Sequence, residues 1–168
     1  MNTTGRNLVT SSLATFTLTL LICVSSFALK KYNVDDKNIG LSGYDPVSYF
    51  NTDAAKKGPL KGNAKIQFKT ELATYNFSSE ANKHEFIKNP AKFEPAYGGW
   101  CAFAVAKNKV KVEIDPESFL IQDGKLLLFF KGFLNNTRDK WQTTKDKTPA
   151  SYLMDAEKNW PETINTEE

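Results

Sequence analysis

The sequence predicts an α+β fold, a single small domain in which short antiparallel β-hairpins pack against helices. Residues 64–70 alternate apolar and polar side chains, as is typical of a half-buried strand, and residues 74–77 form its predicted partner. A second hairpin is indicated by Asp123-Gly124, which separates apolar runs at 119–122 and 125–130. The chain shows no internal repeat and no linker, so one domain is the simplest interpretation.

The segment before the first hairpin is predicted to be mostly irregular. Residues 29–40 are expected to be extended. Asp45 is placed to cap a short helical turn that starts at Pro46, because proline is tolerated at the first helical position. Residues 51–63 are polar and predict a loop.

Two helices are expected between the first hairpin and the second. Ser78 or Ser79 caps a helix that runs to about Asn89, where Pro90 stops it. The pair Gly98-Gly99 predicts a tight bend, and the alanine-rich run after it predicts a helix.

The last third of the chain adds one strand and two helices to the prediction. Residues 109–114 alternate and predict a strand, followed by a turn over 115–118. Helices over about 135–144 and 149–159 form a helical C-terminal extension.

The first 28 residues have the pattern of a secretory signal peptide. One basic residue, Arg6, precedes an apolar core over Phe16–Val24, and small residues stand before Leu29. The core is too short to span a bilayer comfortably. We therefore expect an exported protein, periplasmic or secreted, with no transmembrane anchor after cleavage and a mature domain over 29–168.

A lipoprotein signal is the weaker alternative for the same segment. Cys23 ends a Leu-Leu-Ile-Cys run, but the residue before a lipidated cysteine is normally small, and here it is Ile22. Cys23 is therefore expected to leave with the signal peptide, which makes Cys101 the single cysteine of the mature chain and excludes an internal disulfide.

Charge and histidine content exclude several classes of site. The chain carries 22 Lys and Arg against 19 Asp and Glu, well interspersed, which gives no basic arm for nucleic acid. The densest lysines, near residues 56–65, are interpreted as a solvated loop rather than a phosphate site. His84 is the one histidine, so a zinc site with several histidine ligands is excluded.

Several linked motifs resemble the YHS-domain family, specifically its exported bacterial members, over about residues 40–130. The motifs that carry the resemblance are Gly43–Phe50, Tyr75–Phe86, Asn89-Pro90, Tyr97–Ala102, Asp115-Pro116 and Asp123–Leu126. The resemblance implies a relation to small cysteine-bearing domains suspected of binding heavy metals. This chain departs from them because Ser48, Ser78 and Ser79 stand where those domains have cysteines, so a site with several thiolates does not carry over.

Three residues are candidate metal ligands, and each has a second interpretation. Cys101 lies near a predicted helix start, which would stabilise a thiolate, or it is simply a buried small residue. His84 could bind a metal or act as a base to Cys101, or it is an ordinary helix histidine. Asp45 could be a hard ligand, or the cap of its turn.

Three aromatic residues could instead line a pocket for an organic ligand. Tyr44, Tyr97 and Trp100 flank glycine-marked bends, although aromatic residues in such places are more often part of a core. We treat them as candidate ligand-binding residues.

The first functional hypothesis is an exported protein without catalytic activity that binds a metal ion. A thiolate with an imidazole favours copper(I), with zinc second. The alternatives are a module that binds a small ligand or a protein segment and merely packs Cys101, and an enzyme that uses the Cys101 thiol with His84 as base.

Overall fold

The structure is a computed structural model, and it describes residues 30–51 and 53–166. It confirms the α+β prediction of helices with small antiparallel sheets in a single domain. The predicted signal peptide lies outside the described residues. The elements in chain order are η1 (Leu41–Gly43), η2 (Pro46–Phe50), α1 (Ala54–Lys57), β1 (Asn63–Lys69), β2 (Thr74–Phe77), α2 (Glu80–Lys88), α3 (Pro90–Phe93), η3 (Ala96–Gly99), α4 (Ala102–Asn108), β3 (Asp115–Gln122), β4 (Lys125–Phe129), α5 (Thr137–Thr143) and α6 (Pro149–Thr163).

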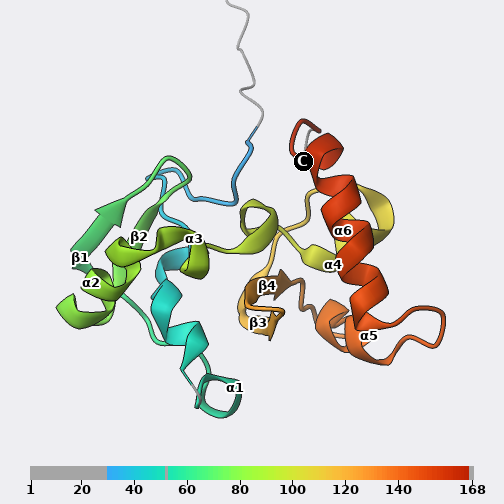
Figure 1. Cartoon of the computed structure of the whole chain (residues 1–168), viewed down its shortest axis with the longest axis horizontal. Coiled ribbons are helices and arrows are strands. Elements are labelled where there is room, and N and C mark those ends of the chain that lie inside the picture. Colours follow the sequence, from blue (N-terminus) through green and yellow to red (C-terminus); the bar gives the residue numbers. More distant parts are fainter. Residues whose placement is uncertain (1–29, 52, 167–168) are drawn as a thin grey trace, which may run out of the picture.

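The β3–β4 hairpin lies between two groups of elements (Figure 1). On one side are β1, β2, α2 and α3, and on the other are α4, α5 and α6. Both hairpins form as predicted, with β1 antiparallel to β2 and β3 antiparallel to β4. The positive φ of Asp123 and of Gly124 is the turn conformation that an Asp-Gly pair favours.

Strand β4 is buried on both faces, because successive side chains of a strand point in opposite directions. Leu126 and Leu128 pack into one hydrophobic cluster, with the aromatic residues of β2 and α2. Leu127 and Phe129 pack into the other, with α4 and α6. The continuous apolar run of this strand therefore holds the two groups of elements together.

Asp45 ties the start of η2 to the start of α2. Its carboxylate is completely buried. Oδ1 accepts a hydrogen bond from the Val47 amide at 2.9 Å, which confirms the predicted cap. Oδ2 accepts from the amide of Ser78 at 2.8 Å, from its hydroxyl at 2.6 Å, and from Asn82 Nδ2 at 2.6 Å. A buried carboxylate requires such donors, since an unpaired one carries a large desolvation penalty.

The helix α2 begins as the sequence predicts. Ser79 is its N-cap, and the Ser79 hydroxyl accepts from the Asn82 amide at 3.1 Å. Ser78, the other predicted cap, serves Asp45 instead.

The glycine pair at 98–99 receives the N-terminal segment of the described chain. Gly98 and Gly99 have φ of +60° and +84°, and the Gly98 carbonyl accepts from the Asn33 amide at 2.8 Å. A Cβ at Gly98 would lie 2.9 Å from the Lys31 carbonyl oxygen. The Trp100 indole donates to that same oxygen at 3.1 Å, so the bend and the tryptophan together anchor the segment.

The predicted strand over 109–114 is wrong, and so is the predicted turn over 115–118. Residues 110–114 are irregular, and β3 begins already at Asp115. The alternation is reversed at the first two residues, because Val110 is 39% exposed whereas Lys111 is 5% exposed, and Val112 and Ile114 pack against the core as predicted. The Lys111 ammonium donates to the Thr166 carbonyl oxygen, a contact distant in sequence that overrides the local pattern.

Two other elements differ from the prediction in extent. The predicted loop 51–63 contains the short helix α1. Helix α6 continues through Pro161 to Thr163, and the Thr163 hydroxyl donates to the Asn159 carbonyl in the last turn. Within the described chain, none of the helices has both the length and the apolar character needed to cross a membrane.

Replacing Asp45 should strongly destabilise the domain. Asp45→Ala leaves the Ser78 amide and the Asn82 amide group without their acceptor, and we expect a loss of about 3 kcal/mol or more in the free energy of unfolding. Urea denaturation followed by circular dichroism measures it. Asp53→Ala is the matched control, because Asp53 pairs with Lys57 at the surface and should cost less than about 0.5 kcal/mol. Equal losses for the two variants would contradict the role assigned to Asp45.

Replacing Gly98 should cost more than replacing a glycine with free space around it. Gly98→Ala combines an unfavourable positive φ with a clash against backbone, whereas a Cβ at Gly124 (φ +75°) would meet nothing within 4 Å. We expect Gly124→Ala to lower the free energy of unfolding by about 1 kcal/mol and Gly98→Ala by at least about 1 kcal/mol more. The same denaturation measurement tests this. Equal free energies of unfolding for the two variants would contradict the tight docking of residues 31–33 against Gly98.

Candidate functional site

Cys101 is completely buried and its sulfur is hydrogen-bonded within the core. It stands at the start of α4, beside Leu128 of β4. The Phe130 amide donates to Sγ at 3.4 Å, and Sγ lies 3.3 Å from Thr137 Oγ1. Because the Thr137 hydroxyl donates to the Phe130 carbonyl, the thiol proton is left to donate to Thr137. The structure therefore favours the interpretation of Cys101 as a packed residue.

His84 and Asp45 do not complete a site with Cys101. His84 lies exposed on α2, and the sulfur's hydrogen bonds go to Thr137 and Phe130 rather than to the imidazole. Asp45 already accepts four hydrogen bonds from its own neighbourhood. Over residues 30–51 and 53–166, no three Cys, His, Asp or Glu side chains are grouped so that they could hold a metal ion. The geometry thus gives no support to a copper or zinc site at these residues, or to a thiol–imidazole pair.

The serines that stand at the cysteine positions of the YHS resemblance belong to the network around Asp45. The Ser48 hydroxyl donates to the Asp45 carbonyl at 2.7 Å and accepts from the Leu60 amide at 2.9 Å. The Ser78 hydroxyl donates to the Asp45 carboxylate. These positions serve hydrogen bonding in this chain, and they offer no soft ligand.

The three candidate aromatic residues lie in different places. Trp100 is buried against the N-terminal segment. Tyr97 is buried beside Trp160, and its hydroxyl donates to Glu157 Oε1 at 3.3 Å. Tyr44 is half-buried, with the Lys61 ammonium 3.8 Å from its ring centroid, and its hydroxyl donates to Glu117 Oε1 at 2.8 Å. They do not form one pocket.

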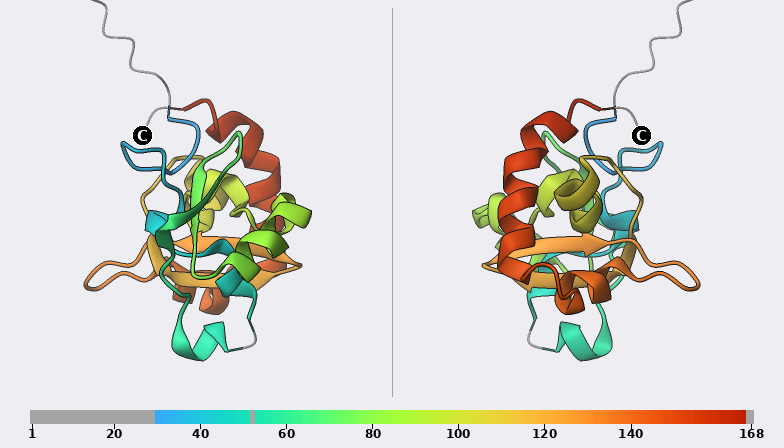
Figure 2. Two further views of the ribbon diagram at one scale, coloured as in Figure 1. Left: turned by 90° about the vertical axis from the view of Figure 1, so that its left-hand side faces the viewer. Right: turned by 90° about the vertical axis from the view of Figure 1, so that its right-hand side faces the viewer.

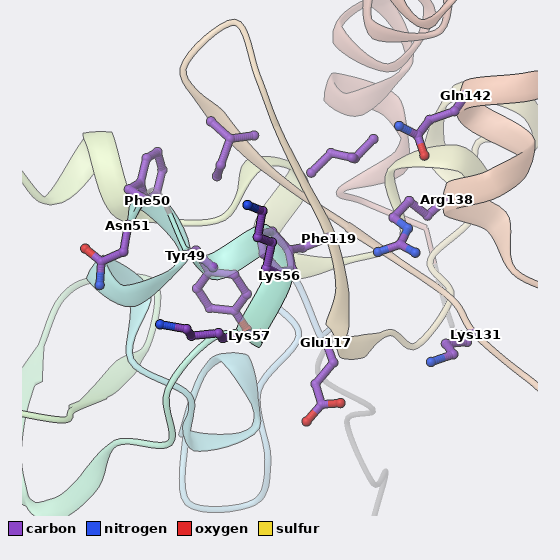
Figure 3. A pocket seen from close by; sticks show the side chains of 14 residues that line it. Tyr49, Phe50, Asn51, Lys56, Lys57, Glu117, Phe119, Lys131, Arg138 and Gln142 are labelled. Carbon is purple, nitrogen blue, oxygen red and sulfur yellow. The ribbon is translucent and has the colours of Figure 1, made fainter.

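An open cleft of about 760 Å³ lies where the two groups of elements meet over β3 (Figure 3). Its lining comes from η2, α1, β3, the segment after β4, and α5. The lining residues are Tyr49, Phe50, Asn51, Ala54, Lys56, Lys57, Gly58, Glu117, Phe119, Leu120, Ile121, Lys131, Arg138 and Gln142.

The charged side chains of the cleft are mostly cationic. Lys56 and Lys57 lie on one side of the hollow, and Lys131 and Arg138 on the other, with Glu117 between them (Figure 3). Lys57 pairs with Asp53 at 2.7 Å, and Lys131 has a longer contact of 4.0 Å with Asp115. Within the lining, four cations face one carboxylate, and Asp53, Asp115 and Asp139 outside the lining offset part of this charge.

Arg138 is the cleft residue whose hydrogen bonding is incomplete. Its Nε is buried without a hydrogen-bond partner in the described structure. The nearest carboxylate oxygen with which it forms an ion pair, Asp139 Oδ1, is 3.7 Å away, beyond hydrogen-bonding distance. Since solvent does not reach Nε, an acceptor in the cleft would have to meet the terminal nitrogens of the guanidinium.

The aromatic side chains form an uncharged wall of the cleft. Tyr49 and Phe119 meet edge to face at 4.9 Å, and the Tyr49 hydroxyl donates to the Pro116 carbonyl at 3.0 Å. Burial, followed by the neighbouring Tyr44, raises the pKa of Tyr49 well above its usual value. The hydrogen bond to Glu117, followed by burial, raises the pKa of Tyr44. Tyr49, the phenol of the cleft lining, therefore stays neutral near pH 7.

Sequence reasoning missed this cleft. The sequence predicts a solvated loop at Lys56 and Lys57, and the structure leaves both exposed but places them in the lining of the cleft. The sequence contains one signal for the cleft, the type of residue at position 138. After Arg6, Arg138 is the one arginine of the chain, and apart from His84 the other basic residues are lysines. An isolated arginine among lysines suggests a need for the planar, bidentate guanidinium.

Comparisons with known proteins identify no relative. No protein-family model matches the chain, and neither a curated protein nor a solved structure shows significant similarity to it. The resemblance to YHS domains stays a prediction.

The buried thiol should be unreactive in the folded protein. In a Cys23→Ser variant, where Cys101 is the one thiol, we expect Ellman's reagent to label less than a tenth of the protein in native buffer at pH 8 within minutes, because only thiols that reach solvent react. Labelling should become complete in urea.

Metal binding provides an independent readout on the same variant. The packed thiol predicts no tight copper(I) binding under reducing conditions, with or without His84→Ala. Rapid labelling of the native protein would restore the hypothesis that Cys101 and His84 act together. So would the binding of one equivalent of copper(I) that disappears when His84 is replaced.

Proposed function

We propose that this protein is a binding module without catalytic activity, and that it holds a small organic anion in the cleft between α1 and α5. The observation that carries the proposal is the placement of Arg138, whose side chain faces the lysines of α1 across the hollow. A phosphate or carboxylate group between the two sides would accept charge-assisted hydrogen bonds from these cations.

The apolar wall indicates the other part of the ligand. Phe50, Leu120 and Ile121 line the cleft beside its cations and keep exposed surface. Tyr49 and Phe119 are nearly buried, and the Tyr49 hydroxyl donates to a backbone carbonyl. The volume is in the range of small-molecule sites, which combine apolar surface with a few convergent polar groups. The ligand class that fits is an anion attached to a flat or apolar group.

The lining residues support binding rather than catalysis. Among the residues that the structure describes, the lining includes no Ser, Thr, Cys or His, so these residues supply no usual nucleophile–base pair. Cys101, the residue of the thiol-enzyme hypothesis, is buried in the core and is not among them.

Phenyl phosphate is the probe that tests the proposal. Isothermal titration calorimetry should show that the full chain binds phenyl phosphate in preference to phenol, which lacks the anion, and to inorganic phosphate, which lacks the ring. Arg138→Gln should weaken binding about tenfold or more, because a charge-assisted hydrogen bond contributes about 1.5–3 kcal/mol. Added salt should also weaken binding, since ions screen the charges of an open cleft.

Two further variants make this test specific. Lys131→Gln removes a second cleft cation and should also weaken binding. Lys88→Gln removes the same charge from the exposed face of α2, where it pairs with Glu85, and should leave affinity within about twofold. Equal affinity for phenol and phenyl phosphate would refute the proposal. So would an unchanged affinity for phenyl phosphate in both cleft variants, provided that they fold.

A further inference from the structure

The segment between β4 and α5 forms a narrow projecting turn with an apolar tip. Lys131 and Asn136 pair as an isolated bridge, and the Gly132 amide donates to the Asn135 carbonyl at 2.8 Å. Phe133 and Leu134 occupy the tip, 100% and 91% exposed. The orange loop extends beyond the body of the molecule in both views of Figure 2. We call residues 131–136 the projecting loop.

The exposure of this tip is unusual for the described part of the chain. The next most exposed large apolar side chains are Met154 at 71% and Leu60 at 52%. The base of the loop is held firmly, since both the amide and the hydroxyl of Thr137 donate to the Phe130 carbonyl at 3.0 Å. The backbone therefore holds two adjacent apolar side chains away from the core, at a cost in hydration that a binding partner would remove.

The base of the same loop carries two basic residues, Lys131 with Asp115 at 4.0 Å and Arg138 with Asp139 at 3.7 Å. Lys131 begins the loop, and Arg138 follows it on α5. Both residues also line the cleft. An apolar tip with basic residues one step behind it matches the layering of an anionic bilayer, in which acyl chains lie beneath a negatively charged surface.

We propose that the projecting loop inserts Phe133 and Leu134 into the interface of an anionic lipid bilayer, and that Lys131 and Arg138 then hold a lipid headgroup phosphate at the cleft. The headgroup part of this inference rests on the proposed function, because it identifies the anion of the cleft as a phosphodiester whose apolar group is the lipid itself.

A lipid surface fits the tip better than a protein partner does. A stable protein interface buries roughly 800 Å² on each partner. Two side chains on a convex turn offer far less area than that, whereas interfacial insertion needs only a small apolar wedge supported by charge attraction. Such an anchor is weak and reversible, so the association should depend strongly on lipid charge.

The test places a fluorophore at the tip, so that it reports insertion of the projecting loop and of no other part of the chain. The full chain with Cys23→Ser and Leu134→Cys carries the environment-sensitive dye NBD at residue 134, while the buried Cys101 stays unlabelled. Vesicles of phosphatidylglycerol should shift the dye emission to the blue, and vesicles of phosphatidylcholine should need about tenfold more lipid for the same shift. The dye at Met154→Cys on α6 is the matched control and should keep its aqueous spectrum.

The cleft residues and the soluble probe separate the two proposals. Arg138→Gln should raise the lipid concentration needed for half the shift several-fold, and Phe133→Ala should do the same without weakening phenyl phosphate binding. An unshifted tip with phenyl phosphate still bound would overturn the membrane inference alone. Loss of both would overturn both proposals. A blue shift caused by excess unlabelled chain instead of vesicles would assign the tip to a protein contact and overturn the inference.

Discussion

The whole structure depends on a strand that is apolar on both faces. Leu126 and Leu128 point to one side of β4, and Leu127 and Phe129 point to the other. A hairpin of this kind is stable only when both faces are covered, since each fully buried side chain contributes about 1.5–3 kcal/mol through the hydrophobic effect. The N-terminal elements cover one face and the C-terminal helices cover the other, which makes the chain one domain with two hydrophobic clusters.

This arrangement determines where the cysteine and the cleft lie. The segment that connects the two groups of elements runs parallel to β4, with Pro95 beside Leu126 and Cys101 beside Leu128. Cys101 therefore lies inside the hydrophobic cluster that β4 forms with α4 and α6. The cleft forms where the two groups fail to close over β3, so its wall takes Tyr49 from one group and Arg138 from the other. The proposed binding of an anion and the proposed lipid contact both use this junction, because α5 and the projecting loop begin there.

Asp45 illustrates why a ligand assigned from residue type requires a structure. A carboxylate that binds a metal must have an oxygen free to coordinate it. In this fold, Asp45 Oδ1 accepts one amide hydrogen bond and Oδ2 accepts three hydrogen bonds, and these contacts join η2 to α2. The cap interpretation of Asp45 could be made from the Asp-Pro pair alone. Its second set of partners, Ser78 and Asn82, lies more than thirty residues away and could not be predicted from that pair.

Local signals in the sequence determined the fold class, both hairpins and a helix capped by Ser78 or Ser79, because these features depend on residues close together in the chain. The structure decided for Ser79. Alternating side chains fix which face of a strand is buried, and Asp-Gly favours its turn. The irregular path of residues 110–114, the burial of Cys101 and the position of Arg138 across from Lys56 were decided only by tertiary structure. Those features depend on contacts between residues far apart in sequence, such as Lys111 with Thr166, and no local pattern contains the packing free energy that favours them.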